Sequence, residues 1–256
     1  MDNRTPRPVA VVTGAGRRQG IAASIVERLA HDGFDVAFSS WRPYDERMTW
    51  GADTSAADAL AAAGRDAGGR AVTIEADFED VAAPVILFDR AEAELGPVQA
   101  LVVAHCESVD TTILDSTVES FDRHMAVNAR ATWLLVREFA RRFRSTPGSG
   151  RIVALTSDHT AGNLAYGASK GAMDRIVLAA SRELAHLGVT ANVVNPGATD
   201  TGWITADLRD HIVAATPGGR IGLPADAANL VAFLCSAEGG WVNGQLLHSD
   251  GGASAQ

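Results

Sequence analysis

A tyrosine and a lysine stand four positions apart in the segment TSDHTAGNLAYGASKGA, residues 156–172. On a helix, Tyr166 and Lys170 would share one face, so a phenol would stand beside an ammonium group. Proton chemistry at a substrate needs such a pairing of an acidic and a cationic side chain. A hydroxyl side chain, Ser157, lies a short way upstream in the same segment.

A glycine-rich turn follows the first strand-like run of the chain. In VAVVTGAGRRQGIAASIVERLA (9–30), three glycines, Gly14, Gly16 and Gly20, would let the backbone approach a phosphate closely. Ile21 then begins the apolar face of a helix, whose N-terminus offers free N–H groups and the positive end of its dipole. The order of strand, glycine turn and helix predicts a dinucleotide-binding site.

The end of the second strand-like run indicates which dinucleotide would bind. Sites for NAD usually place an acidic residue there, where it accepts bonds from the ribose hydroxyls. The groups available here and in the glycine turn are Ser39, Ser40, Trp41, Arg42, Arg17 and Arg18. Hydroxyl and guanidinium groups suit a 2′-phosphate, which favours NADP(H). Asp45 is expected to lie too far past the strand end to act as the ribose ligand.

The elements that must position these residues alternate along the chain. Nearly continuous apolar runs, typical of strands covered on both faces, occupy 8–13, 34–40, 70–76, 98–104, 150–156, 189–195 and 244–250. Helix-like segments occupy 20–31, 55–67, 81–95, 117–144, 165–187 and 224–236, and 48–58 reads as an extended loop. The alternation predicts an α/β fold with a doubly wound parallel sheet of about seven strands and helices on both faces, in a single domain spanning 1–256.

Composition narrows the class of function. The chain has 256 residues with 46% hydrophobic and 21% charged residues, as in ordinary globular proteins, and a net charge of −9. So acidic a chain is a poor general binder of nucleic acid or anionic membrane. Cys106 and Cys235 form no metal-ligand spacing and no disulfide framework, and no metal site is expected. Without a membrane-spanning run or an apolar leader before the first strand, a cytoplasmic protein is expected.

Taken together, these motifs resemble the single-domain branch of the short-chain dehydrogenase/reductase family, and in detail bacterial 3-oxoacyl-carrier-protein reductases. The resemblance covers nearly the whole chain. It is carried by the Thr13-Gly14 loop, Asp77, VNARA with Asn128, Ser157, YGASK with Tyr166 and Lys170, NPGATDT (195–201), and GRIGLPADAANLVAFL with NGQLLHSDGG near the C-terminus.

The resemblance implies an NADP(H)-dependent oxidoreductase that interconverts a ketone and a secondary alcohol, with 3-oxoacyl thioesters as candidate substrates. Tyr166 would be the general acid or base, and Lys170 would lower its pKa from the ordinary value of about 10 and hold the nicotinamide ribose. Ser157 would bind the substrate oxygen, and Asn128 would hold a water that relays protons to Lys170.

The resemblance also implies the cofactor contacts, a lid and an assembly. The cofactor-binding set is Thr13, Gly14, Gly16, Arg17, Arg18, Gly20, Ile21, Ser40, Trp41, Arg42, Asp77, Phe78, Ala104, Tyr166, Lys170, Pro196, Gly197, Thr199 and Thr201. Asp77 could accept a bond from the adenine amino group or cap the next helix. The segment 199–219 would form a mobile substrate lid. Because members of the family are commonly tetramers, the resemblance implies a homotetramer, and the expected substrate is a small-molecule carbonyl or alcohol.

Three departures from the family pattern leave alternatives open. Five residues separate Gly14 from Gly20, as in bacterial enoyl-carrier-protein reductases, although that branch spaces its tyrosine and lysine more widely than here. The motif after the fourth strand reads VAHC (103–106), which leaves room for a non-catalytic NADP-sensing or scaffold protein. His105 within it is expected to be a structural substitution.

The third departure is the short stretch between Ser157 and Tyr166. Because LTS ends the fifth strand where the family places its serine, Ser157 is expected to keep its position. The shortening then falls on DHTAGNLA, a loop that tolerates changes of length and would leave a more open substrate entrance.

Overall fold

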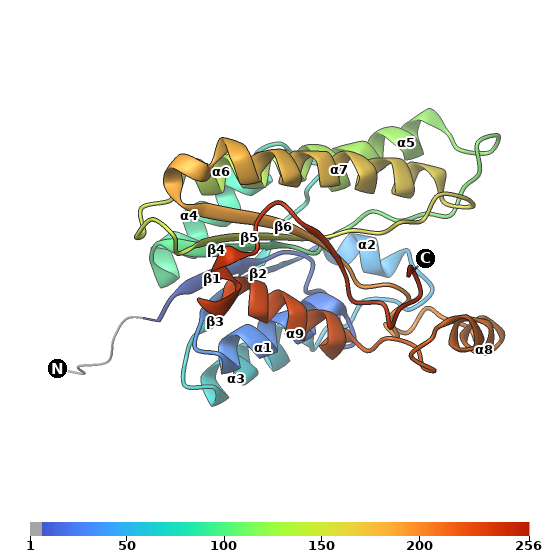
Figure 1. The fold of residues 1–256 in the computed structure, drawn as a ribbon, viewed down its shortest axis with the longest axis horizontal. Coiled ribbons are helices and arrows are strands. Elements are labelled where there is room, and N and C mark those ends of the chain that lie inside the picture. Colours follow the sequence, from blue (N-terminus) through green and yellow to red (C-terminus); the bar gives the residue numbers. More distant parts are fainter. Residues whose placement is uncertain (1–6, 256) are drawn as a thin grey trace.

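Seven strands form one parallel sheet at the centre of the computed structural model, which describes residues 7–255 (Figure 1). The strand order is β3-β2-β1-β4-β5-β6-β7. The strands are β1 (Val9–Val12), β2 (Asp35–Ser40), β3 (Ala71–Glu75), β4 (Val98–Val103), β5 (Gly150–Leu155), β6 (Val189–Asn195) and β7 (Leu246–His248). Every residue of β1, β5 and β6 is buried, which explains their continuous apolar runs. The predicted seven-stranded doubly wound sheet is confirmed.

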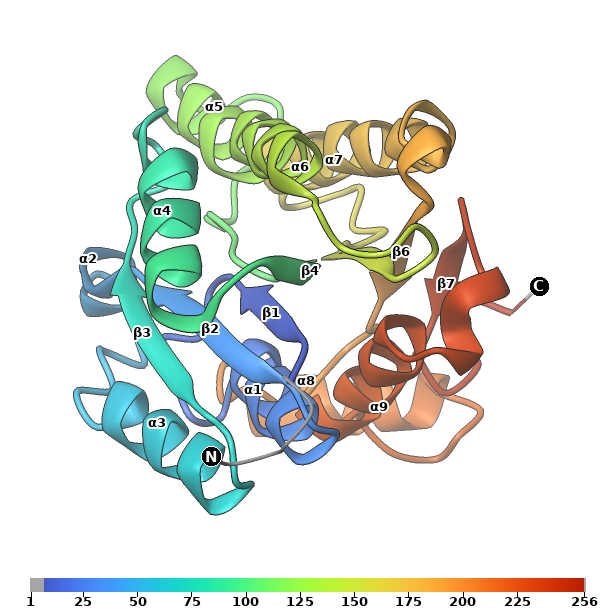
Figure 2. The ribbon, with the colours of Figure 1, turned by 90° about the vertical axis from the view of Figure 1, so that its left-hand side faces the viewer.

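Helices cover both faces of this sheet (Figures 1 and 2). One layer contains α4 (Ala83–Leu95), α5 (Val118–His124), α6 (Ala131–Arg142) and α7 (Leu164–Glu183). The other contains α1 (Ile21–His31), α3 (Ala56–Asp66) and α9 (Pro224–Cys235). Two apolar cores result, one under each layer, with Phe88, Leu101 and Ile152 in the first and Ile25, Leu29 and Phe38 in the second.

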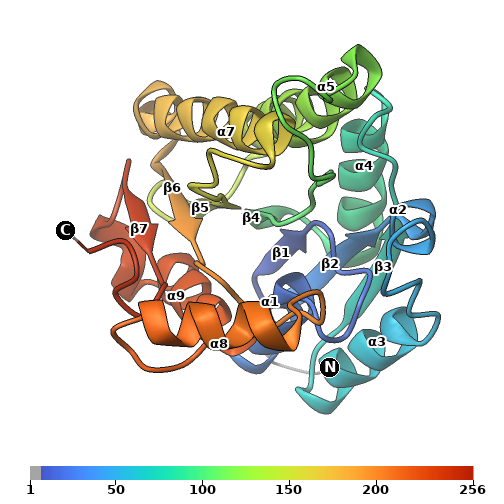
Figure 3. The same ribbon diagram turned by 90° about the vertical axis from the view of Figure 1, so that its right-hand side faces the viewer.

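Two further helices, α2 (Arg42–Glu46) and α8 (Ala206–Ala215), lie at the end of the sheet where the strands finish (Figure 3). Neither was expected from the sequence. Pro43 stands in the first turn of α2, where its fixed φ favours a helix start. Thr205 caps α8 by accepting a hydrogen bond from the backbone N–H of Leu208.

Two expected helices are subdivided. The range 117–144 contains α5, a π-helical turn η1 (Met125–Arg130) and α6, which follow one another without a break. The range 165–187 ends earlier than expected: α7 stops at Glu183, and a 3₁₀ turn η2 (Ala185–Leu187) follows. A second 3₁₀ turn, η3 (Glu238–Trp241), precedes β7. Across residues 7–255, no helix has both the length and the apolarity needed to cross a membrane.

Candidate active site

The candidate site lies at the carboxyl end of the sheet, where the chain leaves β1 and β4 in opposite directions. The strand order reverses between these two neighbours, and such a switch point leaves a crevice outside the strand ends. Four segments gather there: the glycine turn after β1, residues 104–107 after β4, Ser157 after β5, and Pro196 onward after β6. The residues named from the sequence therefore come together at one edge.

Tyr166 and Lys170 stand on one face of α7, as predicted. The Lys170 ammonium lies 5.6 Å from the centroid of the Tyr166 ring. Lys170 is buried, and its Nζ donates a 2.7 Å hydrogen bond to the backbone carbonyl of Leu155 at the end of β5. Burial lowers the pKa of Lys170, and this shift is opposed by Cys106 and Asp174.

The pKa of Tyr166 differs from expectation. Burial raises it well above the ordinary value for a phenol, the neighbouring Cys106 thiol adds to the rise, and the Ser157 side chain partly opposes it. The expected lowering of the Tyr166 pKa by Lys170 is therefore not found, and desolvation dominates the shift. In consequence the phenol keeps its proton at neutral pH, which is the state that a proton donor needs.

Ser157 lies just past the end of β5, at the position expected from the strand. Its hydroxyl accepts a 3.2 Å hydrogen bond from the backbone N–H of His159, and it is close enough to Tyr166 to influence the pKa of the phenol. The side chains of Asp158, His159 and Thr160 are exposed, so the loop turns outward from this point. The structure thus brings Ser157 and Tyr166 together despite the short connection.

The short loop is packed directly on α7. The carbonyl of His159 occupies the space that a Cβ on Gly167 would need, so this helix position accepts no side chain without a shift. At the loop's other end, the buried Asn163 amide donates to Ser108 Oγ (3.1 Å) and Asp110 Oδ1 (2.8 Å). Gly167, directly after Tyr166, is the sequence feature that could have predicted this packing, and it was not among the residues named from the sequence.

Asn128 is buried in the π-helical turn η1. Its side-chain oxygen accepts from the Glu107 N–H (2.8 Å), while its amide donates to the Glu107 carbonyl (2.8 Å) and to Ser169 Oγ (2.8 Å). Asn128 therefore fixes the chain after β4 to the helix that bears Tyr166 and Lys170. Asn128 was predicted from the sequence as a site residue, but the π-helical turn that contains it was not predicted.

His105 lies in VAHC, the segment after β4 that departs from the family motif, and its ring takes part in a closed hydrogen-bond network. Its Nε2 lies 2.9 Å from the Val127 carbonyl, which can only accept, so Nε2 carries the proton. Nδ1 therefore accepts from the Thr13 hydroxyl at 2.7 Å. The ring also packs on Phe78, with centroids 4.1 Å apart. The prediction that His105 is structural agrees with these contacts, which brace the glycine turn against η1.

Replacing His105 by Ala is expected to lower the free energy of unfolding by roughly 2–4 kcal/mol at neutral pH. The change would remove the side-chain bonds that His105 makes with the Thr13 hydroxyl and the Val127 carbonyl, at about 0.5–1.5 kcal/mol each, together with the packing of its ring on Phe78. Urea unfolding measures the effect, with the exposed His31→Ala variant as the control. An equal, small effect of both variants would contradict a bracing role.

The same experiment at lower pH gives a second check. Burial lowers the pKa of His105 to about 3, below the ordinary value of 6.5. The unfolded chain therefore binds the extra proton first as the pH falls, and the stability that neutral His105 contributes is lost progressively between about 6.5 and 3. The difference between the wild type and His105→Ala should narrow over this range.

The glycine turn has the close backbone approach that was expected. Gly14 has φ +84°, and a Cβ there would lie 2.6 Å from the Cα of His105, so a side chain at this position is excluded by both conformation and space. The Ala104 N–H donates a 3.0 Å bond to Thr13 Oγ1, which ties the two crossing segments together. Gly20 then precedes α1, which begins at Ile21 as predicted.

Asp45 corrects one expectation from the sequence. Its carboxylate is buried against Gly16, where an added Cβ would lie 2.6 Å from Asp45 Oδ2. It accepts a 2.9 Å bond from the indole N–H of Trp50 and lies 3.5 Å from Nε of Arg17. The unexpected helix α2 turns the chain back toward the glycine turn, so Asp45 is not too far from the strand end.

The other residues that were named at the end of the second strand have side chains that lie in different directions. Arg42 and Arg18 are exposed, and they pair with Glu46 (3.4 Å) and Asp53 (3.0 Å), respectively. Ser40 lies near Gly16, since a Cβ added there would be 3.7 Å from the Ser40 Cβ, and Trp41 is half-buried just before α2. Of the named cations, Arg17 is therefore the one held over the crevice.

Residues after β3 and β6 complete the edge. Asp77 accepts a 2.9 Å bond from the Glu79 N–H within its own turn, and it does not cap α4, whose N-cap is Ala82. After β6, Gly197 has φ +61° and packs on Asp250, beside Pro196. Further along, Thr199 and Thr201 are buried, and the Thr201 carbonyl accepts a 2.9 Å bond from Arg17, so the chain after β6 contacts the glycine turn.

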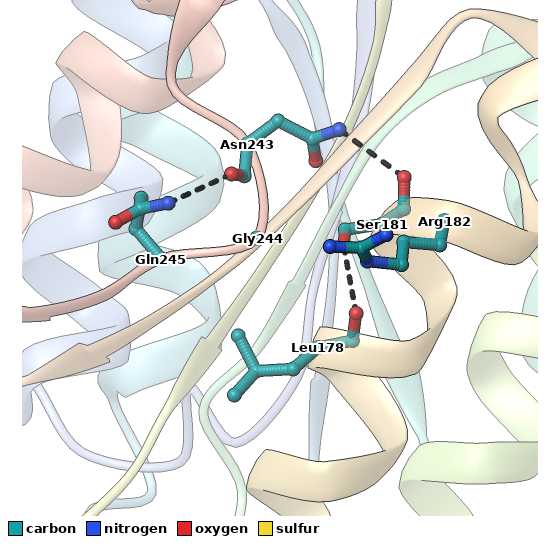
Figure 4. Close-up of a pocket in the computed structure, with 6 residues that line it drawn as sticks. All are labelled: Leu178, Ser181, Arg182, Asn243, Gly244 and Gln245. Atoms are coloured by element: carbon teal, nitrogen blue, oxygen red, sulfur yellow. Dashed lines mark hydrogen bonds between the residues drawn. The ribbon is translucent and has the colours of Figure 1, made fainter.

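No cluster of three or more potential metal ligands occurs in the part of the chain that the structure covers. A pocket does occur near the other end of α7, lined by Leu178, Ser181, Arg182, Asn243, Gly244 and Gln245 (Figure 4). Ser181 is fifteen residues beyond Tyr166 on the same helix, a separation of roughly 22 Å. This pocket is therefore distinct from the candidate active site.

Comparison with known proteins identifies the family. A family model described as enoyl-(acyl carrier protein) reductase matches residues 14–254. An uncharacterized oxidoreductase, YjdA of Bacillus subtilis, is 38% identical over 251 residues, covering 95% of this chain and 96% of that protein. A chloroplastic NADPH-dependent aldehyde reductase-like protein of Arabidopsis thaliana is 34% identical, covering 95% and 93%.

A solved structure supports the same family assignment as the family model and the two relatives. The short-chain dehydrogenase of Burkholderia cenocepacia, in complex with NADP, superposes with a TM-score of 0.86 at 32% identity, covering 99% of this chain and 100% of that one. The fold and the gathered site define a Rossmann-type oxidoreductase. The chain belongs to the short-chain dehydrogenase/reductase family.

Proposed function

We propose that the chain is an NADP(H)-dependent oxidoreductase that interconverts a ketone and a secondary alcohol. One observation carries the proposal: the Tyr166 phenol, the Ser157 hydroxyl and the buried Lys170 ammonium converge beside a glycine turn at the sheet's carboxyl edge. The relatives named for NADPH-dependent aldehyde reduction and the neighbour solved with NADP support this choice.

The residues at the edge fit a dinucleotide. At Gly14 the backbone passes so close to His105 that no side chain intervenes, and the turn leads directly into the N-terminus of α1. Arg17 lies over this turn with its guanidinium directed at Asp45 and the Thr201 carbonyl. We assign the phosphates to the glycine turn, the 2′-phosphate to Arg17, and the nicotinamide end to Lys170 and the segment after Pro196.

The chain's own residues bind and orient the substrate oxygen. When bound, the cofactor supplies or accepts the hydride. Ser157 donates a hydrogen bond to the substrate oxygen, and Tyr166, protonated at neutral pH, donates the proton that this oxygen gains during reduction. Lys170 stabilises the phenolate that remains, and Asn128 holds the helix and the post-β4 segment in register while serving the water relay implied by the family.

Enoyl-thioester reduction is the second candidate. It is favoured by the description of the matching family model and by the long glycine turn. The three residues between Tyr166 and Lys170 favour carbonyl reduction instead, because the enoyl reductase branch spaces its tyrosine and lysine more widely. Among carbonyl substrates, we propose 3-oxoacyl thioesters as a class to test.

The assay that tests this function is oxidation of NADPH, followed by absorbance, with a panel of ketones, aldehydes, 3-oxoacyl thioesters and enoyl thioesters. Oxidation with carbonyl compounds alone supports the first proposal, and oxidation with enoyl thioesters alone supports the second. Tight NADPH binding without turnover on any member of the panel would instead support the non-catalytic NADP-sensing alternative.

NADPH is expected to be preferred over NADH, and Arg17→Ala is expected to weaken this preference. The loss of one charged hydrogen bond to the 2′-phosphate costs about 1.5–3 kcal/mol, or roughly 10- to 150-fold in kcat/KM with NADPH. Use of NADH should change little. Arg65→Ala, which removes an exposed arginine from α3, is the control. Equal use of both cofactors by the wild type would contradict the assignment.

The segment 199–219 is proposed as the substrate lid. It contains α8 and the half-exposed Trp203, and it is joined to the crevice by the bond from Arg17 to the Thr201 carbonyl. Arg209 also pairs with Asp200 at 2.6 Å, which holds α8 against the start of the segment. A lid with few buried side chains can open at low cost.

We also propose that the chain assembles as a homotetramer. Large apolar side chains are exposed on two faces: Val118 and Trp133 on α5 and α6, and Trp241 and Leu246 around β7. The second face adjoins the pocket in Figure 4, where Asn243 donates to the Ser181 carbonyl at 3.2 Å. Light scattering on the purified chain measures the mass of the assembly directly.

A further inference from the structure

The segment from Trp41 to Asp53 lies at the carboxyl end of the sheet, and we call it the strap. It contains α2 and lies beside the ends of β2 and β3 (Figure 3). The strap is fixed at several points. Arg47 pairs with the buried Glu107 after β4, and Asp53 pairs with Arg18 of the glycine turn. The strap is thus tied to the connections that follow both β1 and β4.

The strap places one carboxylate in the adenosine half of the proposed cofactor site. Asp45 Oδ2 occupies the space directly outside Gly16, beside Ser40 at the end of β2. Asp45 is only 8% exposed, so its charge is screened little by water. A phosphate on the adenosine ribose would have to approach this same space between the glycine turn and the β2 end.

Arg17 is the partner that Asp45 and such a phosphate would share. Its Nε lies 3.5 Å from Asp45 Oδ1, and its guanidinium stacks over the Trp50 ring at 4.4 Å from the centroid. Trp50 in turn donates its indole N–H to Asp45 at 2.9 Å. These three side chains form a closed group, near the carboxylate of Asp53, which pairs with Arg18.

We propose that Asp45 is a specificity-determining residue, which competes with the 2′-phosphate of NADPH for Arg17 and thereby limits the preference for NADPH over NADH. The inference rests on the proposed function, because it assumes that a dinucleotide binds in this crevice. NADH carries two ribose hydroxyls at this position, and a carboxylate accepts hydrogen bonds from hydroxyls but repels a phosphate. Asp45 therefore opposes one cofactor and not the other.

The test replaces Asp45 by Asn, which removes the charge and can still accept the Trp50 hydrogen bond. Dissociation constants for NADPH and NADH are measured by direct titration of the purified protein. The ratio of NADH to NADPH dissociation constants is expected to rise about 10-fold, the effect of about 1.4 kcal/mol. Asp58→Asn, the same substitution on the exposed face of α3, is the control and should leave the ratio unchanged.

A second titration isolates the adenosine end. Adenosine 2′,5′-bisphosphate and AMP differ by the 2′-phosphate and lack the nicotinamide, so their binding reports on Asp45 without any turnover. Asp45→Asn is expected to bind the bisphosphate about 10-fold more tightly and AMP almost unchanged. Asp45→Ala, checked by thermal unfolding, gives the same comparison if the Asn variant is unstable.

The outcomes separate this inference from the proposed function. Two ratios of dissociation constants are compared: NADH to NADPH, and AMP to adenosine 2′,5′-bisphosphate. If the wild type binds dinucleotides and both neutral variants leave these ratios unchanged, Asp45 does not determine specificity, and the proposed function stands. If the wild type binds neither NADPH nor NADH at millimolar concentration, the proposed function fails and the inference fails with it. A fall in either ratio would show that Asp45 assists the 2′-phosphate, contrary to the proposal.

Discussion

Tyr166→Phe is expected to lower ketone reduction by at least ~10²–10⁴-fold while NADPH binding stays nearly unchanged. The substitution removes only the hydroxyl that donates the proton, and it keeps the ring on the same face of α7 as Lys170. Burial raises the pKa of this phenol, so the wild type holds the proton ready across the neutral range. Steady-state rates and NADPH titration of the variant measure the two quantities separately.

The chain offers a matched control for this substitution, because Tyr44 is its only other tyrosine. Tyr44 lies in the strap, with its ring 5.2 Å from the Arg47 guanidinium, and the proposed proton transfer does not use it. Tyr44→Phe should therefore retain most of the activity. Ketone reduction by Tyr166→Phe at a rate close to that of Tyr44→Phe would remove Tyr166 from the mechanism.

Ser157→Ala is expected to have the second-largest effect, a fall in kcat of ~10²-fold with little change in NADPH affinity. The hydroxyl sits at the end of β5, which the sheet holds in place, and it lies close enough to affect the Tyr166 phenol. Its hydrogen bond to the substrate oxygen strengthens as charge develops there, so its loss appears in kcat more than in ground-state binding.

Thr160→Val serves as the control for Ser157→Ala, since Thr160 is exposed in the short loop beyond it. If Ser157→Ala stays active while Thr160→Val or Thr156→Val does not, the loop has been rebuilt and another hydroxyl binds the substrate. The shortened wall, packed on Gly167, should also admit bulkier ketones than a longer loop would, which the substrate panel measures as kcat/KM.

Much of the fold could be predicted because its signals are local. The buried strands β1, β5 and β6 read as unbroken apolar runs, and Gly20 followed by Ile21 marked the start of α1. The positions of Tyr166 and Lys170 followed from helical periodicity alone. Ser157 could be placed because a strand end fixes its own last residues whatever the length of the loop that follows.

The features that were missed depend on contacts between distant segments. Asp45 reaches Gly16 because α2 turns the chain back toward the glycine turn, and nothing in the local sequence shows where that turn leads. The raised pKa of Tyr166 arises mainly from burial, which depends on contacts with distant segments, whereas the local sequence shows only the spacing to Lys170. The need for glycine at position 167 is explained by the His159 carbonyl, which lies where a side chain would begin and which the sequence does not place there.

The most direct test of carbonyl reduction uses an α,β-unsaturated ketone and NADPH that carries deuterium at both C4 positions of the nicotinamide. One substrate then offers the enzyme either a carbonyl or an alkene, and mass spectrometry with NMR locates the transferred label. We predict an allylic alcohol with deuterium on the carbinol carbon, formed by the wild type and not by Tyr166→Phe. A saturated ketone with deuterium on the β-carbon would contradict this and establish enoyl reduction instead.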